Sequence, residues 1–245
     1  MRPQLSPHWF AHAWKALAQQ HHRDLLPLLS SLLPRDGVAV DVGAHAGQFT
    51  KLFARLAPEG RVIAVEPSPY ALSILRMVVR LKRLERVTIV PKGLSDRPGS
   101  LVLNSPIKRS GAIGYGLASF AAAASARPVR SDTVAVDTLD RLADALGLAR
   151  CDLIKCDVEG WEVQVLEGGR GVLERFRPAL LVEVSAASLA RSGQTPERLW
   201  SLVAPLGYAA ARLPGGEAVA GFAGDADYLF RAAAKPAAQA ASPPR

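Results

Sequence analysis

The sequence predicts a doubly wound α/β domain with a mostly parallel sheet. Short apolar runs alternate with longer amphipathic segments along most of the chain, which indicates strands that alternate with helices. Several runs end in an acidic residue or a glycine where the next helix begins. The chain has 245 residues and 49% hydrophobic content, which suits one domain with a substantial core. Right-handed crossovers make the sheet mostly parallel, and we expect seven strands with an antiparallel strand at one edge.

The strands and helices follow one another in a regular order after an N-terminal helical segment. We expect strands at residues 38–42, 61–66, 87–91, 100–103, 132–136, 151–157, 178–184, 208–213 and 227–231. We expect helices at residues 48–56, 69–84, 138–146, 161–173 and 196–206. A glycine-rich connection at residues 214–224 separates the last two strands, which can therefore form an antiparallel hairpin at the sheet edge.

The chain divides into three parts. Residues 1–35 form a helical extension, residues 36–231 form the main domain, and residues 232–245, rich in Ala, Pro and Ser, form a tail that we expect to be disordered. In the extension, Trp9 and Trp14 belong to a set of apolar side chains at near-helical spacing. This spacing favours a helix packed on the main domain, and a membrane-surface or partner helix is the alternative.

Composition narrows the function classes. The net charge is +8, but the basic residues are scattered without interleaved aromatic residues, so we expect no nucleic-acid partner. No apolar run reaches the roughly 18 to 20 residues of a membrane span, and the N-terminus lacks the layout of a secretion signal. Cys151 and Cys156 flank a predicted strand on opposite faces, so they cannot pair. These features predict a reduced, cytoplasmic protein.

The first candidate site is the loop from Asp41 to Gly47, which follows the first predicted strand. Gly43 permits a tight turn and close approach of the backbone to a ligand, and the helix that begins near Gly47 presents free N–H groups. Ligands bind at this end of the strands in open α/β sheets. The spacing G-x-x-x-G differs from the G-x-G-x-x-G of dinucleotide binders. The Asp41 carboxylate would repel a pyrophosphate but suits a cationic amino acid.

Two further segments lie at the ends of the second and third strands. Glu66 ends the second strand before Pro67, and a carboxylate there can accept hydrogen bonds from both ribose hydroxyls. After the third strand, a backbone N–H can bind an adenine edge and a carboxylate can reach the exocyclic amine, although a plain surface turn is the alternative. This third segment consists of Gly93, Leu94, Ser95 and Asp96.

The strand at residues 151–157 brings Asp157 and Glu159 to the same edge of the sheet. Helix capping is the alternative role for Asp157. Lys155 lies within an apolar strand, which requires a partner for its amine. With Glu183, the two acids form three carboxylates with oxygen-ligand chemistry, so a metal ion stays an alternative. No His or Cys spacing supports zinc, and we assign no metal ligand.

Taken in order, these segments resemble the FkbM family of methyltransferases over about residues 36–231. Two positions depart from the family pattern: His45, where Asn is usual, and Cys156, where Ile or Val is usual. The matching segments are residues 41–49, 62–68, 138–140, 152–168, 181–184 and 227–230.

The resemblance implies a Rossmann-like class I methyltransferase fold with S-adenosylmethionine as cofactor. It also implies transfer of the methyl group to a hydroxyl oxygen of a small molecule or glycan, either a sugar or a secondary metabolite. The implied cofactor contacts are Asp41, Gly43, Ala44, His45 and Gly47 for the methionine part, Glu66 and Pro67 for the ribose, Leu94, Ser95 and Asp96 for the adenine, and Asp157 at the rim.

Methyl transfer requires alignment of the acceptor oxygen and removal of its proton. We expect Asp157 or Glu159 to orient the hydroxyl or act as base, with His45 as the next candidate. Residues 104–131 lack periodicity and are expected to form a lid or acceptor-recognition loop through Ser119 and Phe120, with unstructured filler as the alternative. A nicotinamide-dependent oxidoreductase and a non-catalytic binding or scaffold protein stay open, as does a homodimer.

Overall fold

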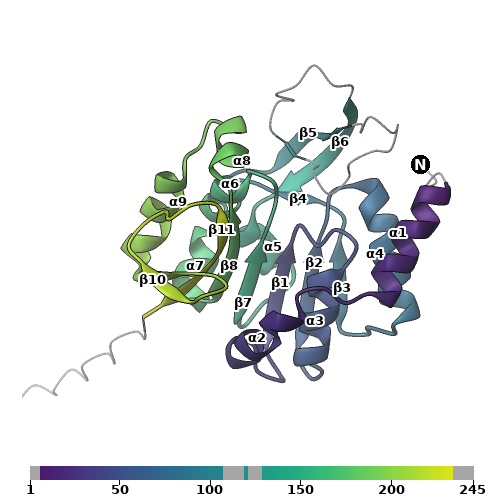
Figure 1. Ribbon diagram of the computed structural model, residues 1–245, viewed down its shortest axis with the longest axis horizontal. Helices are drawn as coiled ribbons and strands as arrows, with labels where there is room; N and C mark the ends of the chain where they lie inside the picture. The colour runs from purple at the N-terminus through teal and green to yellow at the C-terminus, as the bar shows by residue number, and fades with distance from the viewer. Residues whose placement is uncertain (1–5, 107–118, 121–128, 234–245) are drawn as a thin grey trace, which may run out of the picture.

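The computed structural model describes residues 6–106, 119–120 and 129–233, and its described strands form one eight-stranded sheet and one three-stranded sheet (Figure 1). The larger sheet has the order β10-β9-β11-β8-β7-β1-β2-β3. Its strands are β1 (Val38–Val42), β2 (Arg61–Val65), β3 (Val87–Val90), β7 (Leu153–Cys156), β8 (Ala179–Val184), β9 (Tyr208–Arg212), β10 (Glu217–Val219) and β11 (Ala226–Ala232).

Five neighbouring strands of this sheet are parallel: β3, β2, β1, β7 and β8. At the other edge, β11, β9 and β10 pair antiparallel. The mostly parallel α/β sheet and the antiparallel pairing of β9 with β11 are therefore confirmed. The number of strands differs from the seven expected, because the connection between β9 and β11 itself contains β10. This connection is long enough to fold back and pair with the free edge of β9.

The short strands expected at residues 100–103 and 132–136 lie outside the large sheet. They belong to β5 (Gly99–Pro106) and β6 (Val129–Asp137), which pair antiparallel over their whole length, with β4 (Gly93–Leu94) parallel to β6. Part of the loop expected at residues 104–131 is thus strand, and most of the remainder lies outside the described residues. The expected disordered tail falls mostly outside them as well.

Helices cover both faces of the large sheet, as a doubly wound fold requires. One face, with Val62 and Leu153, packs against α2 (Leu26–Leu32) and α3 (Gln48–Leu56), and Ala64 packs against α4 (Pro69–Leu81). The other face, with Val40 and Ile63, packs in the largest apolar cluster of the described chain. The helices of that cluster include α5 (Leu139–Ala145), α6 (Glu162–Glu167), α7 (Arg170–Phe176) and α9 (Pro196–Val203).

One helix prediction was wrong, and one helix was missed. The single helix expected at residues 161–173 is divided into α6 and α7 at Gly168 and Gly169, since glycine has a low helix propensity. Gly168 packs so closely on the carbonyl oxygen of Ser95 that a Cβ there would collide. The short helix α8 (Ala186–Arg191) was not expected. Ser185 caps α8, which is too short to produce a periodic pattern in the sequence.

The N-terminal extension packs on the main domain. Its first helix, α1 (Pro7–Ala18), lies beside α4 and buries Trp9, whose indole Nε1 donates to Ser73 Oγ at 2.7 Å (Figure 1). The opposite face leaves Phe10 and Trp14 exposed. No helix in the described part of the chain is long and apolar enough to cross a membrane.

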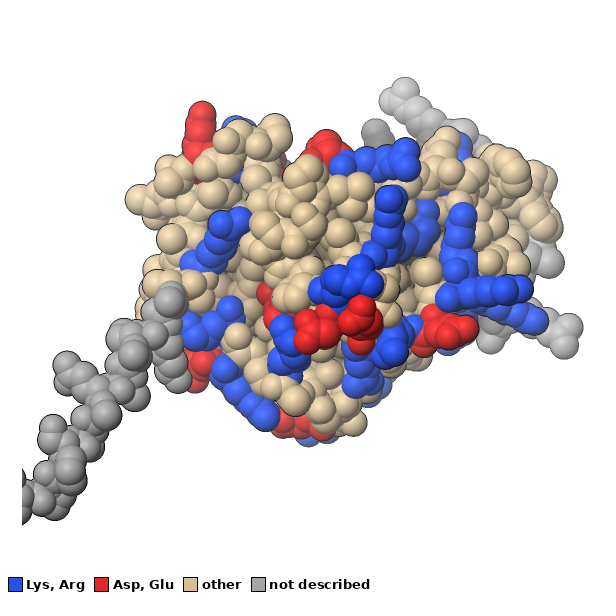
Figure 2. Space-filling model, turned by 90° about the horizontal axis from the view of Figure 1, so that it is seen from below, with Lys and Arg blue, Asp and Glu red and all other residues tan. Residues whose placement is uncertain are grey.

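The basic side chains are scattered over the surface, as the sequence indicated. Figure 2 shows basic side chains spread over one face with acidic side chains among them. Some are paired: Arg35 Nη2 lies 2.9 Å from Glu59 Oε1, and Arg150 Nη1 lies 3.0 Å from Asp36 Oδ2. Both cysteines are buried and free.

Candidate functional site

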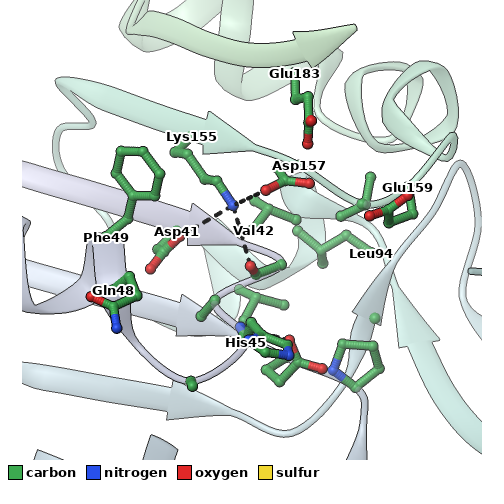
Figure 3. A pocket seen from close by; sticks show the side chains of 18 of the residues that line it. Asp41, Val42, His45, Gln48, Phe49, Leu94, Lys155, Asp157, Glu159 and Glu183 are labelled. Atoms are coloured by element: carbon green, nitrogen blue, oxygen red, sulfur yellow. Dashed lines mark hydrogen bonds and ion pairs between the residues drawn. The ribbon is translucent and has the colours of Figure 1, made fainter. Parts of the chain in front are cut away.

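A cavity of about 240 Å³ lies at the carboxyl ends of β1, β2 and β7 (Figure 3). The parallel strands bring segments that are far apart in the sequence to this one edge. The predicted site residues that line the cavity are Asp41, Gly43, Ala44, His45, Glu66, Pro67, Leu94, Asp157 and Glu159.

Asp41 lies at the floor of the cavity and is fully buried. Its Oδ2 accepts a hydrogen bond from Thr50 Oγ1 at 2.6 Å. Within the described part of the chain, its Oδ1 has no hydrogen-bond partner, although Lys155 Nζ lies 4.0 Å away. Burial raises the pKa of Asp41, against the opposing effects of Lys155 and Thr50. An orphaned buried carboxylate oxygen in a cavity wall suits a ligand that donates hydrogen bonds.

In the loop after Asp41, the backbone itself lines the cavity, because Gly43 has no side chain. Gly43 has φ +76°, and a Cβ there would collide with the carbonyl oxygen of Asp157. The N–H groups of Gly43 and Ala44 both donate to Val65 O at 3.0 Å, which folds the loop onto β2. Gly47, with φ +84°, caps α3 but does not line the cavity.

Glu66 is held by backbone amides at the end of β2. Its two oxygens accept hydrogen bonds from the N–H groups of His45 and Ser68, each at 2.8 Å. Burial raises its pKa to about 7, against these two hydrogen bonds. Since each carboxylate oxygen has two lone pairs, Glu66 can accept further hydrogen bonds from a ligand in the cavity.

His45 lines the cavity in a left-handed conformation, with φ +49°. Its ring centroid lies 5.1 Å from that of His12 on α1. Burial lowers the pKa of His45 to about 4, and the charge of His12 acts in the same direction. The imidazole is therefore neutral at physiological pH and is a weak base.

Lys155 has the partners that its place in an apolar strand required (Figure 3). Its Nζ lies 3.0 Å from Asp157 Oδ2 and donates to the carbonyl oxygen of Gly43 at 3.2 Å. Burial alone would lower the pKa of Lys155, but Asp157 and Asp41 outweigh it and raise that pKa. Lys155 is thus a fixed cation that joins β7 to the β1 loop.

Asp157 and Glu183 both line the cavity at the ends of the neighbouring strands β7 and β8, and we call them the carboxyl pair because each shifts the pKa of the other. Burial alone would raise the pKa of Asp157, but Lys155 and the hydrogen bond with Glu183 hold it below its usual value. The hydrogen bond with Asp157, together with burial, raises the pKa of Glu183 to about 8. At neutral pH the pair therefore holds one proton. The sequence had offered Glu183 only as a metal ligand.

Glu159 lies in the loop that follows Asp157, and Glu162 is the first residue of α6. Glu159, with φ +55°, has its Oε2 3.8 Å from Arg191 Nη2, and burial and Asp157 raise its pKa. Glu162 Oε1 accepts from the N–H groups of Val158 and Gly160, each at 3.1 Å. Sequence reasoning missed this positioning role, although an acid in the first turn of a predicted helix was a signal for it.

The segment proposed for adenine is only partly in the cavity wall. Gly93 and Leu94 line it, but Ser95 and Asp96 do not. Ser95 Oγ donates to Asp96 Oδ1 at 2.9 Å and accepts from Trp161 Nε1 at 3.1 Å. Contacts of Ser95 and Asp96 with a ligand stay predictions.

The segment expected to form an acceptor-recognition loop, residues 104–131, has two described residues near the site. Phe120 lines the cavity, and Ser119 Oγ donates to the carbonyl oxygen of Glu159 at 2.8 Å. In the described residues, no group of His, Cys, Asp or Glu side chains is arranged to hold a metal ion.

Comparison with known proteins identifies the family. Residues 41–209 match the methyltransferase FkbM domain. The chain belongs to this family. S-adenosylmethionine is the family's cofactor, and the bare loop at Gly43, the orphaned Asp41 oxygen and the Glu66 carboxylate fit its amino group and ribose.

Curated relatives share less than a third of their residues with this chain. The 2-O-methyltransferase NoeI of Sinorhizobium fredii is 29% identical over 185 residues, which cover 72% of this chain and 73% of NoeI. Methyltransferase sdnD of Sordaria araneosa is 31% identical over 159 residues, which cover 56% of this chain and 61% of sdnD. The chain therefore spans less than two thirds of sdnD.

Solved structures show the same fold. A methyltransferase FkbM from Methylobacillus flagellatus KT superposes with a TM-score of 0.54 at 18% identity and covers 86% of this chain and 48% of that one. Cofactor-bound Rv0187 from MTB has a TM-score of 0.52 at 15% identity, with 92% and 90% covered. The Rossmann-like methyltransferase fold that the sequence predicted is thereby confirmed.

Proposed function

We propose that this chain transfers a methyl group from S-adenosylmethionine to a hydroxyl oxygen of a sugar or secondary metabolite. The main support for this proposal is the cavity in which Asp41, Glu66 and Asp157 surround the glycine loop after β1. Carboxylates of this kind suit a cofactor with an ammonium group and two ribose hydroxyls. The name of NoeI supports a hydroxyl acceptor, since that relative is a 2-O-methyltransferase.

Cofactor binding follows from the positions of these groups. Asp41 and the backbone of the Gly43 loop hold the methionine part, and Glu66 and Pro67 hold the ribose. Leu94, which lines the cavity, contacts the adenine with its apolar side chain, and Ser95 and Asp96, which follow it outside the cavity wall, border the adenine.

Bound S-adenosylmethionine supplies a methyl group on a positively charged sulfur, which leaves as a neutral thioether when the acceptor oxygen bonds to the methyl carbon. The chain must therefore align the acceptor and take up its hydroxyl proton. Asp157 is the proton acceptor, because Lys155 keeps it ionised, and Glu159 orients the hydroxyl. His45, which burial keeps neutral by lowering its pKa to about 4, is the alternative proton acceptor.

Calorimetry tests the cofactor assignment. The full chain is titrated with S-adenosylhomocysteine, S-adenosylmethionine and NAD. We expect the first two to bind, and Asp41→Asn to weaken them by roughly tenfold, since a charged hydrogen-bond partner is lost. Asp36→Asn, a change at an exposed ion pair, serves as the control. Binding of NAD with no binding of the other two would overturn the proposal.

A further inference from the structure

A second cavity, of about 130 Å³, adjoins the main one on the side of β8 and β11. The two cavities share Phe49, Lys155, Asp157 and Glu183, as well as His22, so they are continuous. Leu181 and Asp227 line only the second one. Any molecule in this second cavity is therefore adjacent to the residues that would surround the methyl group.

The walls of the second cavity differ in chemistry. Asp227 on β11 pairs in register with Glu183 on β8, so their carboxylates project from the same face of the sheet. The ring of Phe49 stacks on His22 with centroids 4.5 Å apart, and Leu181 adds an aliphatic surface. The cavity thus presents hydrogen-bond acceptors on one side and an aromatic and aliphatic surface on the other.

We propose that this second cavity binds the methyl acceptor, and that the acceptor is an uncharged sugar ring with adjacent hydroxyl groups. The inference rests on the proposed methyl transfer. The C–H face of the sugar packs on Phe49, one hydroxyl donates to the Asp157–Glu183 pair, and a neighbouring hydroxyl donates to Asp227. Ionised carboxylates only accept hydrogen bonds, so they select a ligand rich in donors.

The charges in the cavity disfavour two other acceptor classes. A sugar phosphate would face the carboxylates of Asp157 and Asp227, while the cation Lys155 already contacts Asp157 and the carbonyl oxygen of Gly43. An amine would be held as an ammonium ion, because neighbouring carboxylates raise the pKa of a bound amine, and an ammonium has no lone pair to attack a methyl group. A neutral hydroxyl keeps its lone pairs in the same surroundings.

Proton transfer uses the same pair of carboxyl groups. As the acceptor oxygen bonds to the methyl carbon and the carbon–sulfur bond breaks, the hydroxyl proton passes to a carboxylate oxygen of the Asp157–Glu183 pair. Asp157 lines both cavities, so it can reach the reacting oxygen from the cofactor side. Glu183, which already holds one proton at neutral pH, stays hydrogen-bonded to Asp157 during this step.

The test uses the full chain with S-adenosylmethionine and a panel of methyl pyranosides, sugar phosphates and 2-amino-2-deoxy sugars. Formation of S-adenosylhomocysteine measures turnover, and NMR of the product locates the new methyl group. We expect at least one neutral pyranoside to be methylated on oxygen. Asp227→Asn should lower kcat/KM by about tenfold, mainly through KM, because a hydrogen bond to a charged group is lost.

Two further measurements separate acceptor binding from cofactor binding and from folding. Asp227→Asn and Phe49→Leu should lose the saturation-transfer NMR signal of the pyranoside recorded without cofactor. Asp227→Asn should also keep the wild-type affinity for S-adenosylhomocysteine. Glu217→Gln, an exposed acid on β10, is the matched control.

Several outcomes would overturn the assignment. These are methylation of none of the neutral pyranosides by a chain that binds S-adenosylhomocysteine, transfer only to an amine or a phosphorylated sugar, and full activity of Asp227→Asn. Failure of the broader proposal differs from these, because the chain would then not bind S-adenosylhomocysteine at all.

Discussion

On the side of the cavity formed by β1 and β2, backbone groups hold the carboxylates, whereas on the side formed by β7, β8 and β11, charged side chains hold one another. Glu66 accepts from two main-chain N–H groups, and the Gly43 loop is tied to β2 through Val65 O. Asp157 is instead fixed by Lys155 and Glu183. Substitutions that disturb the backbone should therefore impair activity most on the first side. On the second side, activity should be lost when a charge is removed or titrated.

The largest effect is expected at Gly43. Gly43→Ala places a Cβ against the carbonyl oxygen of Asp157 at φ +76°, so the two sides of the cavity are forced apart. We expect kcat/KM to fall roughly 100-fold or more, as misplacement of reacting groups by about 1 Å does in other enzymes. Turnover and S-adenosylhomocysteine affinity measure the effect.

Gly193→Ala is the matched control for this substitution. Gly193 has φ +73°, but a Cβ there would meet no atom within 4 Å. It should cost only the backbone strain of about 1–2 kcal/mol in the free energy of unfolding and leave turnover near wild type. Equal loss of activity in both variants would show that strain, and not the contact of Gly43 with Asp157, explains the effect.

The contrast between the two sides also explains what the sequence could predict. The Asp41–Gly47 loop and Glu66 follow directly from a strand, a turn and a helix that are contiguous in the chain, so their placement was predictable. The Asp157–Glu183–Asp227 group depends on the order of β7, β8 and β11 in the sheet. Periodicity gives strands but not their neighbours, so the carboxyl pair and the role of Asp227 were not predictable.

In the fold as well, elements that depend on contiguous residues were predictable, whereas features that depend on contacts between distant residues were not. Helix α3 was predicted at its observed bounds, because its apolar face has a clear helical period. The separate sheet of β4, β5 and β6 was not predicted, since a short strand has the same pattern in either sheet. The break between α6 and α7 falls at Gly168 and Gly169, and Gly168 packs there against Ser95, far away in the chain.

The next largest effect should come from the acids of the β7 side. Asp157→Asn removes the partner of Lys155 and the proton acceptor together, and we expect kcat to fall by roughly 100-fold to 10,000-fold, the usual range for general-base catalysis. In Glu159→Gln, kcat should fall by a smaller factor, because glutamine keeps a hydrogen-bonding group that can orient the hydroxyl. Asp144→Asn, an exposed change on α5, is the control. Wild-type turnover in both acid variants would exclude this side as the source of the base.

The pH dependence of turnover tests the coupling between Asp157 and Glu183. The pKa of Glu183 is raised to about 8, so the pair loses its proton as the pH rises through that value. We expect kcat/KM to rise with pH up to about 8 and then level off, because the proton on Glu183 is hydrogen-bonded to Asp157 and makes Asp157 a weaker base. Glu183→Gln should remove this limb, because glutamine has no proton that titrates in this range.

Other charged groups face the same pair and bear on that profile. They are Lys155 on β7, Glu159 in the following loop, Asp227 on β11, and His22 in the N-terminal extension. His22→Gln distinguishes a histidine titration from that of the carboxyl pair. A limb that survives in Glu183→Gln but disappears in His22→Gln would contradict the assignment.

The smallest effect concerns stability and comes from Glu162, the first residue of α6, which holds the loop after β7. Burial raises the pKa of Glu162 from 4.5 to about 7. Its protonated form therefore contributes stability that is fully present below about pH 4.5 and is lost as the pH rises through about 7. Glu162→Gln, which resembles the protonated form, lacks this loss. The Tm of wild type minus the Tm of the variant should therefore fall as the pH rises from about 5 to about 8, measured by calorimetry with Glu217→Gln as control. A difference that grows over this range would mean that the ionised carboxylate, through its hydrogen bonds to Val158 and Gly160, is the form that stabilises the loop.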